Sequence, residues 1–370
     1  MYDLHEYLEP VNMAMLNDDN RYNDGQIGNH IKIFEESLPD ISSSEVIIVG
    51  INETRYGSDA ADAIRKHFYQ LHHWHPDIKL ADIGNVGHGA TTADSYAALQ
   101  IVVAELIRMQ KTVIILGGHH DYTLAQYAAY KELKQLIEVT VVDAFIDLKG
   151  DSAARDENFL MEILTGEPNF VKHYNHIGFQ SYYVHPRMLE TMDKLRFDCY
   201  RLGVVKEKME EMEPVLRNTN LLSIDLSAIK YSDSPANKLT PNGLSGEDAC
   251  TLTRYAGMSP LLSSIGFYNY NPNEDVDELS ARQISQMLWY FLEGKNRVRS
   301  EAMMSERHNF NQFHTAFTDL DTVFLQSKKT GRWWMQLPDK KMIPCSYNDY
   351  VNASNNETPE RWLRAQERNT

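Results

Sequence analysis

Short, mainly apolar runs recur along this chain and alternate with stretches that have helical spacing. Four such runs lie at residues 45–51 (EVIIVGI), 112–116 (TVIIL), 139–144 (VTVVDA) and 221–226 (LLSIDL). They are rich in β-branched residues and apolar at successive positions, which is typical of parallel strands that are buried on both faces. Fainter strand candidates lie at residues 78–83, 176–180, 197–203 and 263–270.

The intervening stretches predict amphipathic helices. Residues 92–110 carry apolar side chains at helical spacing, and Thr92 or Asp94 is the expected N-cap. Ser245 and Asp248 have the spacing of a capping box, and residues 276–292 form another long amphipathic stretch. Strands that alternate with helices predict a three-layer α/β/α domain with a mainly parallel sheet.

The end of the chain differs in character from the rest. Residues 324–327 and 332–337 flank a KKTG turn, which predicts a hairpin. Thr358, Pro359 and Glu360 predict the start of a short helix, because proline favours the first helical position. We therefore expect an N-terminal segment (1–44), an α/β domain (45–295) and a small C-terminal extension (296–370).

Three of the tryptophans lie in this C-terminal extension, namely Trp333, Trp334 and Trp362. We expect them to pack the extension against the core. The alternative is an exposed aromatic surface that binds a protein partner.

Composition excludes several classes of function. The chain has 370 residues and a net charge of −16 with no long basic run, so nucleic acid is not expected as a partner. Cys199, Cys250 and Cys345 are far apart and odd in number, which suits a reducing cytoplasm. No signal peptide is recognisable at the N-terminus, and no apolar run is long enough to insert into a membrane.

Polar residues follow three of the four strong strands. Leu116 is followed by GGHHD, Val142 by DAFID, and Ile224 by Asp225. In a parallel sheet the carboxyl ends of the strands share one edge, so these residues are expected to converge there. A single aspartate in such a place more often caps a helix or binds a loop amide. A cluster of buried carboxylates, however, needs a positive charge, and mixed imidazole and carboxylate ligands suit a divalent metal such as manganese. The strand ends therefore offer one histidine and three carboxylates as candidate ligands.

GGHHD (117–121), DAFID (143–147) and SIDLS (223–227) resemble, in this order, the three signature motifs of the ureohydrolase family. That family includes arginase, agmatinase and formimidoylglutamase, and its motifs read GGDHS, DAHxD and SxDxD. Similarity extends over roughly residues 45–295, and NHIGFQ (175–180) looks most like the formimidoylglutamase branch. The resemblance implies an arginase-like fold, a small amidine-like ligand and a homo-oligomer.

The resemblance also implies a metal site. The family binds two manganese ions, which activate a water molecule that attacks a guanidino or formimino carbon. By this resemblance, the residues that hold one ion correspond to His120, Asp143, Asp147 and Asp225, which are all present. The ligands particular to the other ion correspond to Phe145 and Ser227, which are poor ligands. We therefore expect at most one divalent ion and no two-metal centre, with Asp147 as the candidate catalytic residue that orients the water.

Other family positions are also changed. His119 and Asp121 replace an aspartate and a serine in the first motif, and Lys230 stands where the third motif has a later aspartate. Lys230 is expected to supply positive charge in place of a metal. Asn269 stands where a glutamate pairs with the cationic group of the substrate, a pair that an uncharged amide cannot form.

Three hypotheses for function follow. The first, which the changed positions favour, is a divergent member that no longer hydrolyses guanidino compounds and acts through binding or assembly. The second is a hydrolase that uses one metal ion. The third is an ordinary formimidoylglutamase or agmatinase in which His119, Asp121 or Asp233 supplies the replaced ligands.

Overall fold

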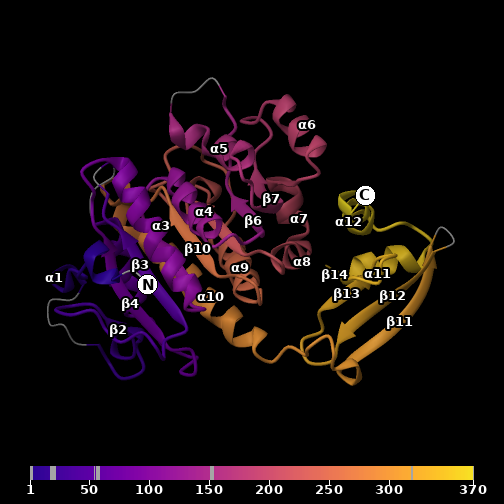
Figure 1. Cartoon of the computed structure of the whole chain (residues 1–370), viewed down its shortest axis with the longest axis horizontal. Helices are drawn as coiled ribbons and strands as arrows, with labels where there is room; N and C mark the ends of the chain where they lie inside the picture. Colours follow the sequence, from indigo (N-terminus) through magenta and orange to yellow (C-terminus); the bar gives the residue numbers. More distant parts are fainter. Residues whose placement is uncertain are drawn as a thin grey trace.

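A computed structural model describes residues 3–16, 22–53, 55, 59–150, 154–317 and 320–369. Its main part is a sheet of ten strands, which run in the order β1-β4-β3-β5-β10-β9-β6-β7-β8, with β2 beside β4 (Figure 1). All neighbouring pairs are parallel except β1 and β4. The strands are β1 (Leu8–Glu9), β2 (Lys32–Ile33), β3 (Val46–Ile51), β4 (Leu80–Val86), β5 (Thr112–Leu116), β6 (Ile137–Val142), β7 (Val171–Phe179), β8 (Asp198–Arg201), β9 (Leu221–Asp225) and β10 (Ser264–Tyr268).

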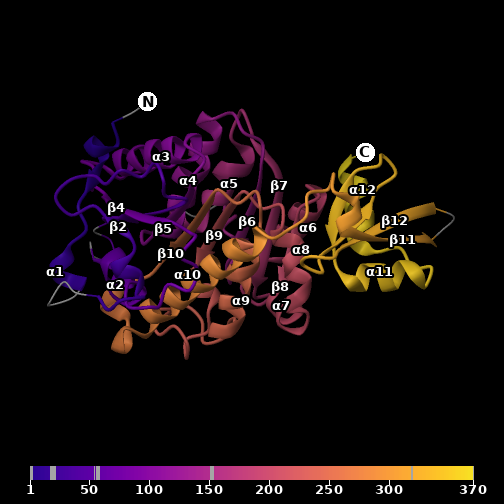
Figure 2. The same ribbon diagram turned by 90° about the horizontal axis from the view of Figure 1, so that it is seen from below.

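Helices cover both faces of this sheet, as Figures 1 and 2 show. One apolar core joins one face of the strands to α2 (Ala60–Phe68), α9 (Gly246–Gly257) and α10 (Leu279–Val298). A second core joins the opposite face to α3 (Thr92–Arg108), α4 (Thr123–Glu132) and α5 (Phe159–Thr165). The three-layer α/β/α prediction is confirmed. The remaining helices of this part are α1 (Met13–Leu16), α6 (Pro186–Lys194), α7 (Leu202–Glu207) and α8 (Met212–Leu216).

All eight strand candidates from the sequence are strands, although some bounds differ. The faint candidate at residues 176–180 belongs to β7, which begins earlier, at Val171. Ser245 is the N-cap of α9 and forms a capping box with Asp248, as predicted. The cap of α3 was placed wrongly, because Thr91 is the N-cap and Asp94 is its capping-box partner.

The C-terminal extension folds into its own small unit, drawn in yellow and light orange in Figure 1. Four antiparallel strands pair in the order β11-β12-β13-β14, and the predicted hairpin is the turn between β12 and β13. The predicted helix after Pro359 is α12. The elements are β11 (Phe310–Phe317), β12 (Leu320–Ser327), β13 (Trp333–Gln336), β14 (Met342–Cys345), α11 (Tyr347–Ser354) and α12 (Glu360–Asn369).

The three tryptophans of the extension are buried, with 6–8% of their surface exposed. Trp333 and Trp362 pack with Phe317 and Phe324 inside the extension, and Trp334 packs with Phe310 on the other face of its sheet. The prediction that they attach the extension to the core is therefore only partly right, since most of their apolar contacts build the core of the extension itself.

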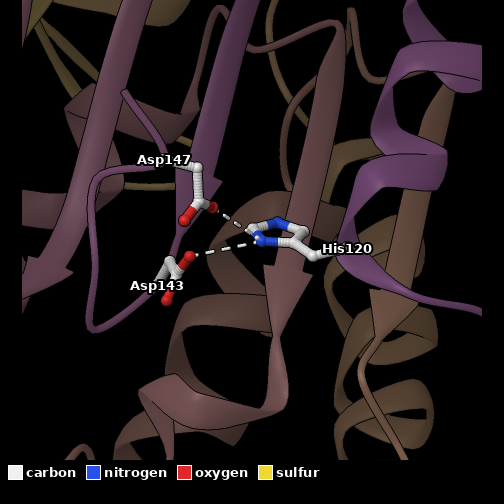
Figure 3. A group of neighbouring side chains, drawn as sticks. All are labelled: His120, Asp143 and Asp147. Atoms are coloured by element: carbon white, nitrogen blue, oxygen red, sulfur yellow. Dashed lines mark ion pairs between the residues drawn. The ribbon is translucent and has the colours of Figure 1, made fainter. Parts of the chain in front are cut away.

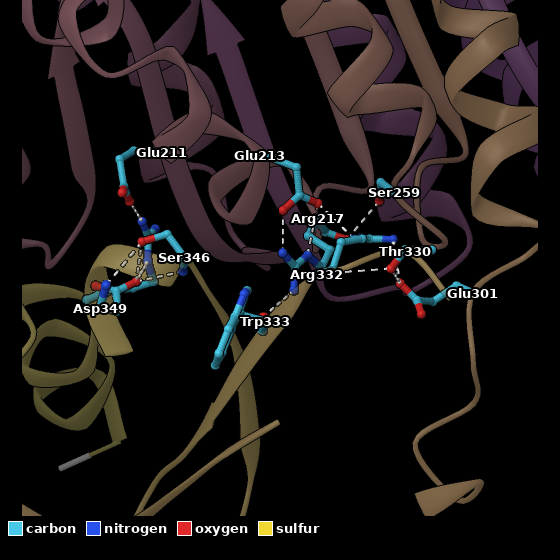
Figure 4. Close-up of polar contacts among 11 residues, drawn as sticks. Glu211, Glu213, Arg217, Ser259, Glu301, Thr330, Arg332, Trp333, Ser346 and Asp349 are labelled. Carbon is cyan, nitrogen blue, oxygen red and sulfur yellow. Dashed lines mark hydrogen bonds and ion pairs between the residues drawn. The ribbon is translucent and has the colours of Figure 1, made fainter. Parts of the chain in front are cut away.

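Charged side chains join the extension to the α/β domain (Figure 4). Arg217 is buried, donates from Nη1 to the carbonyl oxygen of Trp333 at 2.6 Å, and lies 4.5 Å from the ring of Trp334. Glu213 forms ion pairs with both Arg217 and Arg332, the latter at 3.0 Å. A second group of contacts lies along α12, where arginines meet carboxylates of the domain, including Glu211, Asp193 and Asp198.

Within the described part of the chain, no helix is both long enough and apolar enough to span a membrane.

Candidate metal centre

The four predicted ligands sit at the carboxyl edge of the central strands. His120 follows the turn that leaves β5, where Gly117 and Gly118 have φ of +85° and +80°, a conformation that favours glycine. Asp143 directly follows β6, and Asp225 is the last residue of β9. Asp147 lies in the loop after β6, and Figure 3 shows it pointing with Asp143 toward the imidazole of His120.

These side chains converge on one ring nitrogen. Nδ1 of His120 lies 3.2 Å from Oδ2 of Asp143, 3.2 Å from Oδ2 of Asp225 and 3.3 Å from Oδ2 of Asp147. Ligand atoms of His120, Asp143 and Asp147 all lie within 4.8 Å of one another, the spacing of a metal-binding group. His120, Asp143 and Asp225 are buried, whereas the side chain of Asp147 is 12% exposed.

Hydroxyl groups on the Nε2 side of the ring fix the orientation of the His120 imidazole. Nε2 of His120 lies 3.0 Å from the hydroxyl of Ser223, which in turn lies 2.6 Å from the hydroxyl of Thr123. A partner on one ring nitrogen of a ligating histidine commonly directs the other nitrogen at the metal. This arrangement therefore leaves Nδ1 free to face the carboxylates.

The charges at the centre shift the pKa values of its groups. Burial alone would lower the pKa of His120, but the negative charges of Asp225, Asp143 and Asp147 raise it well above its usual value. Burial and the neighbouring charge of Asp143 raise the pKa of Asp147 well above its usual range. Three carboxylates thus compete for one imidazole, which is the kind of environment that a bound cation relieves.

The residues fit a divalent metal ion. Although three carboxylate oxygens lie close to Nδ1 of His120, this buried nitrogen has no partner of hydrogen-bond geometry among the described residues. One imidazole nitrogen and three carboxylate oxygens form a donor set that suits manganese and similar ions. His120, Asp143, Asp147 and Asp225 would hold such an ion.

Phe145 and Ser227 occupy positions beside this cluster. The hydroxyl of Ser227 donates to Oδ1 of Asp143 at 2.7 Å, and the backbone N–H of Phe145 donates to the same oxygen at 3.0 Å. The ring of Phe145 stacks on Tyr183, with centroids 4.7 Å apart. Oδ1 of Asp143, the carboxylate oxygen that does not face His120, therefore accepts two hydrogen bonds from the chain itself.

Asn269 has a role that the sequence analysis missed. Its Oδ1 accepts from the backbone N–H of His120 at 3.1 Å, and its Nδ2 donates to Oδ2 of Asp225. The residue has φ of +60°, which asparagine tolerates better than most residues. Asn269 thus ties two candidate ligands together, a function that its position after β10 alone does not reveal.

The alternative ligands of the third hypothesis have other partners. Asp121 accepts two hydrogen bonds from Arg55, at 3.0 and 3.1 Å, and Asp233 pairs with Lys230 and accepts from the N–H of Gly246. Nδ1 of His119 lies 4.0 Å from Asp156. The ammonium group of Lys230, which was expected to supply positive charge in place of a metal, forms an ion pair with Asp233 at 3.3 Å.

Two further residues near the centre were not predicted. Glu53 is buried, forms an ion pair with Arg55 and accepts a hydrogen bond from the N–H of His119 at 3.1 Å. His176 donates from Nε2 to the carbonyl oxygen of Asp143 at 3.1 Å. Burial lowers the pKa of His176 to about 4, so it remains a neutral hydrogen-bond donor to the backbone of a candidate ligand.

Comparison with known proteins identifies the wider group to which these features belong. A profile described as the arginase family matches residues 46–293, which is well over half of the chain. A formimidoylglutamase from Staphylococcus carnosus is 27% identical over 264 residues, which cover 66% of this chain and 82% of the relative.

Solved structures share the fold. Formiminoglutamase from Trypanosoma cruzi, crystallised with Mn²⁺, has a TM-score of 0.64 at 17% identity, and the match covers 74% of this chain and 99% of that one. Formimidoylglutamase from Bacillus subtilis has a TM-score of 0.64 at 15% identity, with coverage of 74% and 94%. The same architecture thus accommodates manganese in a similar protein.

Proposed function

Because the chain belongs to the arginase family, we propose that it is a metal-dependent hydrolase that cleaves a C–N bond of a linear amidine. A formimino compound such as formimidoylglutamate is the first candidate substrate, since the similar curated proteins are formimidoylglutamases. One divalent ion per chain, preferably manganese, would be held by His120, Asp143, Asp147 and Asp225.

The proposal rests on one observation, the convergence of three carboxylates on Nδ1 of His120 at 3.2–3.3 Å. Such a concentration of negative charge beneath the surface is costly without a cation. When bound there, a divalent ion lowers the pKa of water and polarises the group under attack.

Asp147 is the candidate to handle protons in this reaction. Its side chain is 12% exposed, compared with 2% for Asp143 and 4% for Asp225, so it is the carboxylate most open to a water molecule. Asp147 would orient the attacking water and accept its proton.

A single ion is proposed instead of a pair because of the neighbours of Asp143. A second ion would need ligands at Phe145 and Ser227, where the chain offers an aromatic ring and an uncharged hydroxyl. That hydroxyl already donates to Oδ1 of Asp143. The same observation supports a second candidate function, namely a family member that binds metal and ligand without turnover.

The test combines metal analysis with an assay of product release. The protein is purified without chelators, its manganese content is measured, and formamide or urea release is followed with formimidoylglutamate, agmatine and arginine in turn. We expect about one ion per chain and manganese-dependent turnover of at least one amidine. Asp147→Asn should abolish turnover, whereas Asp339→Asn, which changes an exposed carboxylate of the C-terminal extension, should not.

Each other outcome contradicts a specific part of the proposal. Metal binding without turnover of any amidine would contradict the hydrolase and favour the binding role. No stoichiometric metal would contradict both, and two tightly bound ions would contradict the single-ion centre.

A further inference from the structure

Three aromatic rings lie side by side next to the candidate metal centre, and we call them the aromatic shelf (Phe145, Tyr182 and Tyr183). Phe145 and Tyr183 stack almost parallel, with centroids 4.7 Å apart and planes inclined by 20°. Tyr182 meets Tyr183 edge to face, again with centroids 4.7 Å apart. The rings are far from fully buried, since Tyr183 is 37% exposed and Tyr182 is 65% exposed.

The topology of the sheet brings the aromatic shelf to the metal ligands. Phe145 lies between Asp143 and Asp147 in sequence, and its N–H donates to the carboxylate of Asp143. Tyr182 and Tyr183 follow the end of β7, which pairs in parallel with β6, the strand that Asp143 follows. The shelf and the ligands therefore share the carboxyl edge of two adjacent strands.

Hydrogen bonds hold the exposed outer ring in place. The hydroxyl of Tyr182 donates to Oε1 of Gln180, which is only 2% exposed. Nε2 of Gln180 donates to the carbonyl oxygen of Asn242 at 2.9 Å, and the amide of Asn242 reaches the Tyr182 hydroxyl at 3.5 Å. Fixing an exposed ring costs conformational entropy, and packing in the core does not offset that cost for a ring with most of its surface in water.

We propose that the aromatic shelf binds the planar cationic group of the ligand, an amidinium or a guanidinium. Aromatic faces attract such cations through cation–π contacts and stacking. The carboxylates of the neighbouring centre add long-range attraction for positive charge. This inference rests on the proposed function for the class of ligand, and it assigns ligand selection to Phe145, Tyr182 and Tyr183.

The aromatic shelf offers a binding place for a cation that Asn269, as an uncharged residue, does not offer. Asn269 is engaged with His120 and Asp225 and is uncharged, so it does not provide a carboxylate for a substrate cation. A cation on the shelf would carry positive charge to the side of the centre where Phe145 and Ser227 leave no metal ligand. The cation of the ligand would thus reduce the repulsion among the carboxylates.

The test compares two ligands of nearly the same shape and different charge. Binding of L-arginine, a guanidinium, and L-citrulline, the corresponding neutral urea, is measured by calorimetry on the manganese-loaded protein. The variants are Tyr183→Leu and Phe145→Leu, which keep apolar bulk and remove the ring. Tyr347→Leu is the matched control, because Tyr347 is 58% exposed on the C-terminal extension.

We expect the native protein to prefer arginine over citrulline. Tyr183→Leu should weaken arginine binding on the order of tenfold, as expected for loss of one cation–π contact, and leave citrulline binding unchanged. Equal binding of arginine by native protein and both shelf variants would overturn the proposal, as would absence of any preference for the cation.

Metal content and thermal unfolding of each variant separate this inference from the proposed function. Shelf variants that keep the native manganese content and melting temperature are folded and loaded, so a loss of arginine binding then belongs to the aromatic shelf. The function itself fails on a different result, the absence of metal or of product release in the native protein. If the native protein binds metal and releases no product, a cation preference that depends on Tyr183 can still be observed.

Discussion

The hydroxyl of Ser227 donates a hydrogen bond to Oδ1 of Asp143 at 2.7 Å, on the side of the carboxylate away from His120. The N–H of Phe145 reaches the same oxygen at 3.0 Å. Each carboxylate oxygen has two lone pairs, so these two donors satisfy the oxygen that would otherwise be open to a second cation. The chain itself thus satisfies Oδ1 of Asp143, through one backbone N–H and one side-chain hydroxyl.

The double substitution Phe145→His with Ser227→Asp should raise the manganese content from about one to two ions per chain. It supplies an imidazole and a carboxylate where the native chain has neither, and it removes the Ser227 hydroxyl from Asp143. Metal analysis after equilibrium dialysis measures the change, and Phe145→His with Ser232→Asp, at an exposed serine, is the control. An unchanged manganese content would show that the surrounding residues do not support a second ion.

Arg65→Met should destabilise the α/β domain severely. Arg65 is fully buried, and its guanidinium bonds Asp82 at 2.8 and 2.9 Å and Asp62 at 2.8 Å. Removing one partner leaves the carboxylates buried without compensation, which costs about 3–5 kcal/mol. Urea denaturation followed by circular dichroism measures the loss. Arg196→Met, at an exposed pair with Glu367, should change stability by less than about 1 kcal/mol. Equal effects of the two substitutions would contradict this account.

Arg217→Ala should loosen the C-terminal extension from the α/β domain. The side chain contacts the extension through a hydrogen bond to Trp333 and through the ring of Trp334, and it pairs with Glu213, whose side chain is 12% exposed. Losing a hydrogen bond from a charged group costs about 1.5–3 kcal/mol. We expect faster cleavage between residues 299 and 309 in limited proteolysis, where the chain enters the extension. Arg307→Ala, at an exposed position in that segment, is the control for changes in cleavage chemistry. A cleavage rate equal to that of the native protein would show that the remaining contacts, including Glu213 with Arg332 and those of α12, suffice to hold the extension.

The attachment of α12 should persist well into the acidic range. Burial acts to raise the pKa of Asp198, but the hydrogen bond and charge of His173, together with Arg368 and Arg364, lower it far below the usual carboxyl range. A carboxyl group whose pKa is lowered by folding stabilises the folded state at every pH above its pKa in the unfolded chain. That contribution is lost as the pH falls through the lowered pKa of the folded state. The contribution should therefore be complete at pH 5 and lost only in strong acid.

Asp198→Asn removes this contribution at all pH values. Thermal unfolding of the native protein and the variant between pH 3 and 7 measures the difference, which should be constant down to about pH 4, near the reference value for aspartate. A difference that disappears already at pH 6 would mean that another titrating group controls the attachment.

The α/β domain was predictable because its elements are regular. Strands β3, β5, β6 and β9 are apolar at successive positions, and this pattern together with the intervening helices leaves few arrangements of a parallel sheet. The first strand of the extension, β11, was not recognised, since its sequence FNQFHTAF alternates imperfectly and five of its eight residues are polar or small. The last strand, β14, was missed because it contains Pro344, and proline within a run argues against a strand. Proline is tolerated here because β14 is an edge strand of its sheet.

That a histidine and carboxylates meet at the carboxyl edge was predictable for the same reason, whereas the choice of the four ligands came from the resemblance of the motifs. Contacts between distant parts of the chain were not. Asn269 binds Asp225 and the backbone of His120, which are 44 and 149 positions away. Arg55 and Glu53 approach Asp121 and His119 from a separate loop. Neither the spacing nor the type of these residues indicates the partner, because only the folded chain brings them together.

The N-terminal segment and the C-terminal extension lie at the two edges of the large sheet. A strand at the border of a sheet exposes unpaired N–H and C=O groups, and these groups can recruit strands of other molecules. One border here consists of β1 and β2, which have two residues each and come from the N-terminal segment. At the other border is β8, where Arg364 of α12 donates to the carbonyl oxygen of Phe197 at 2.9 Å and pairs with Asp198. Chain outside residues 46–293 thus lies at both borders of the sheet. We expect loss of the last helix to uncover the start of β8 and to favour aggregation there, while the metal ligands stay in place.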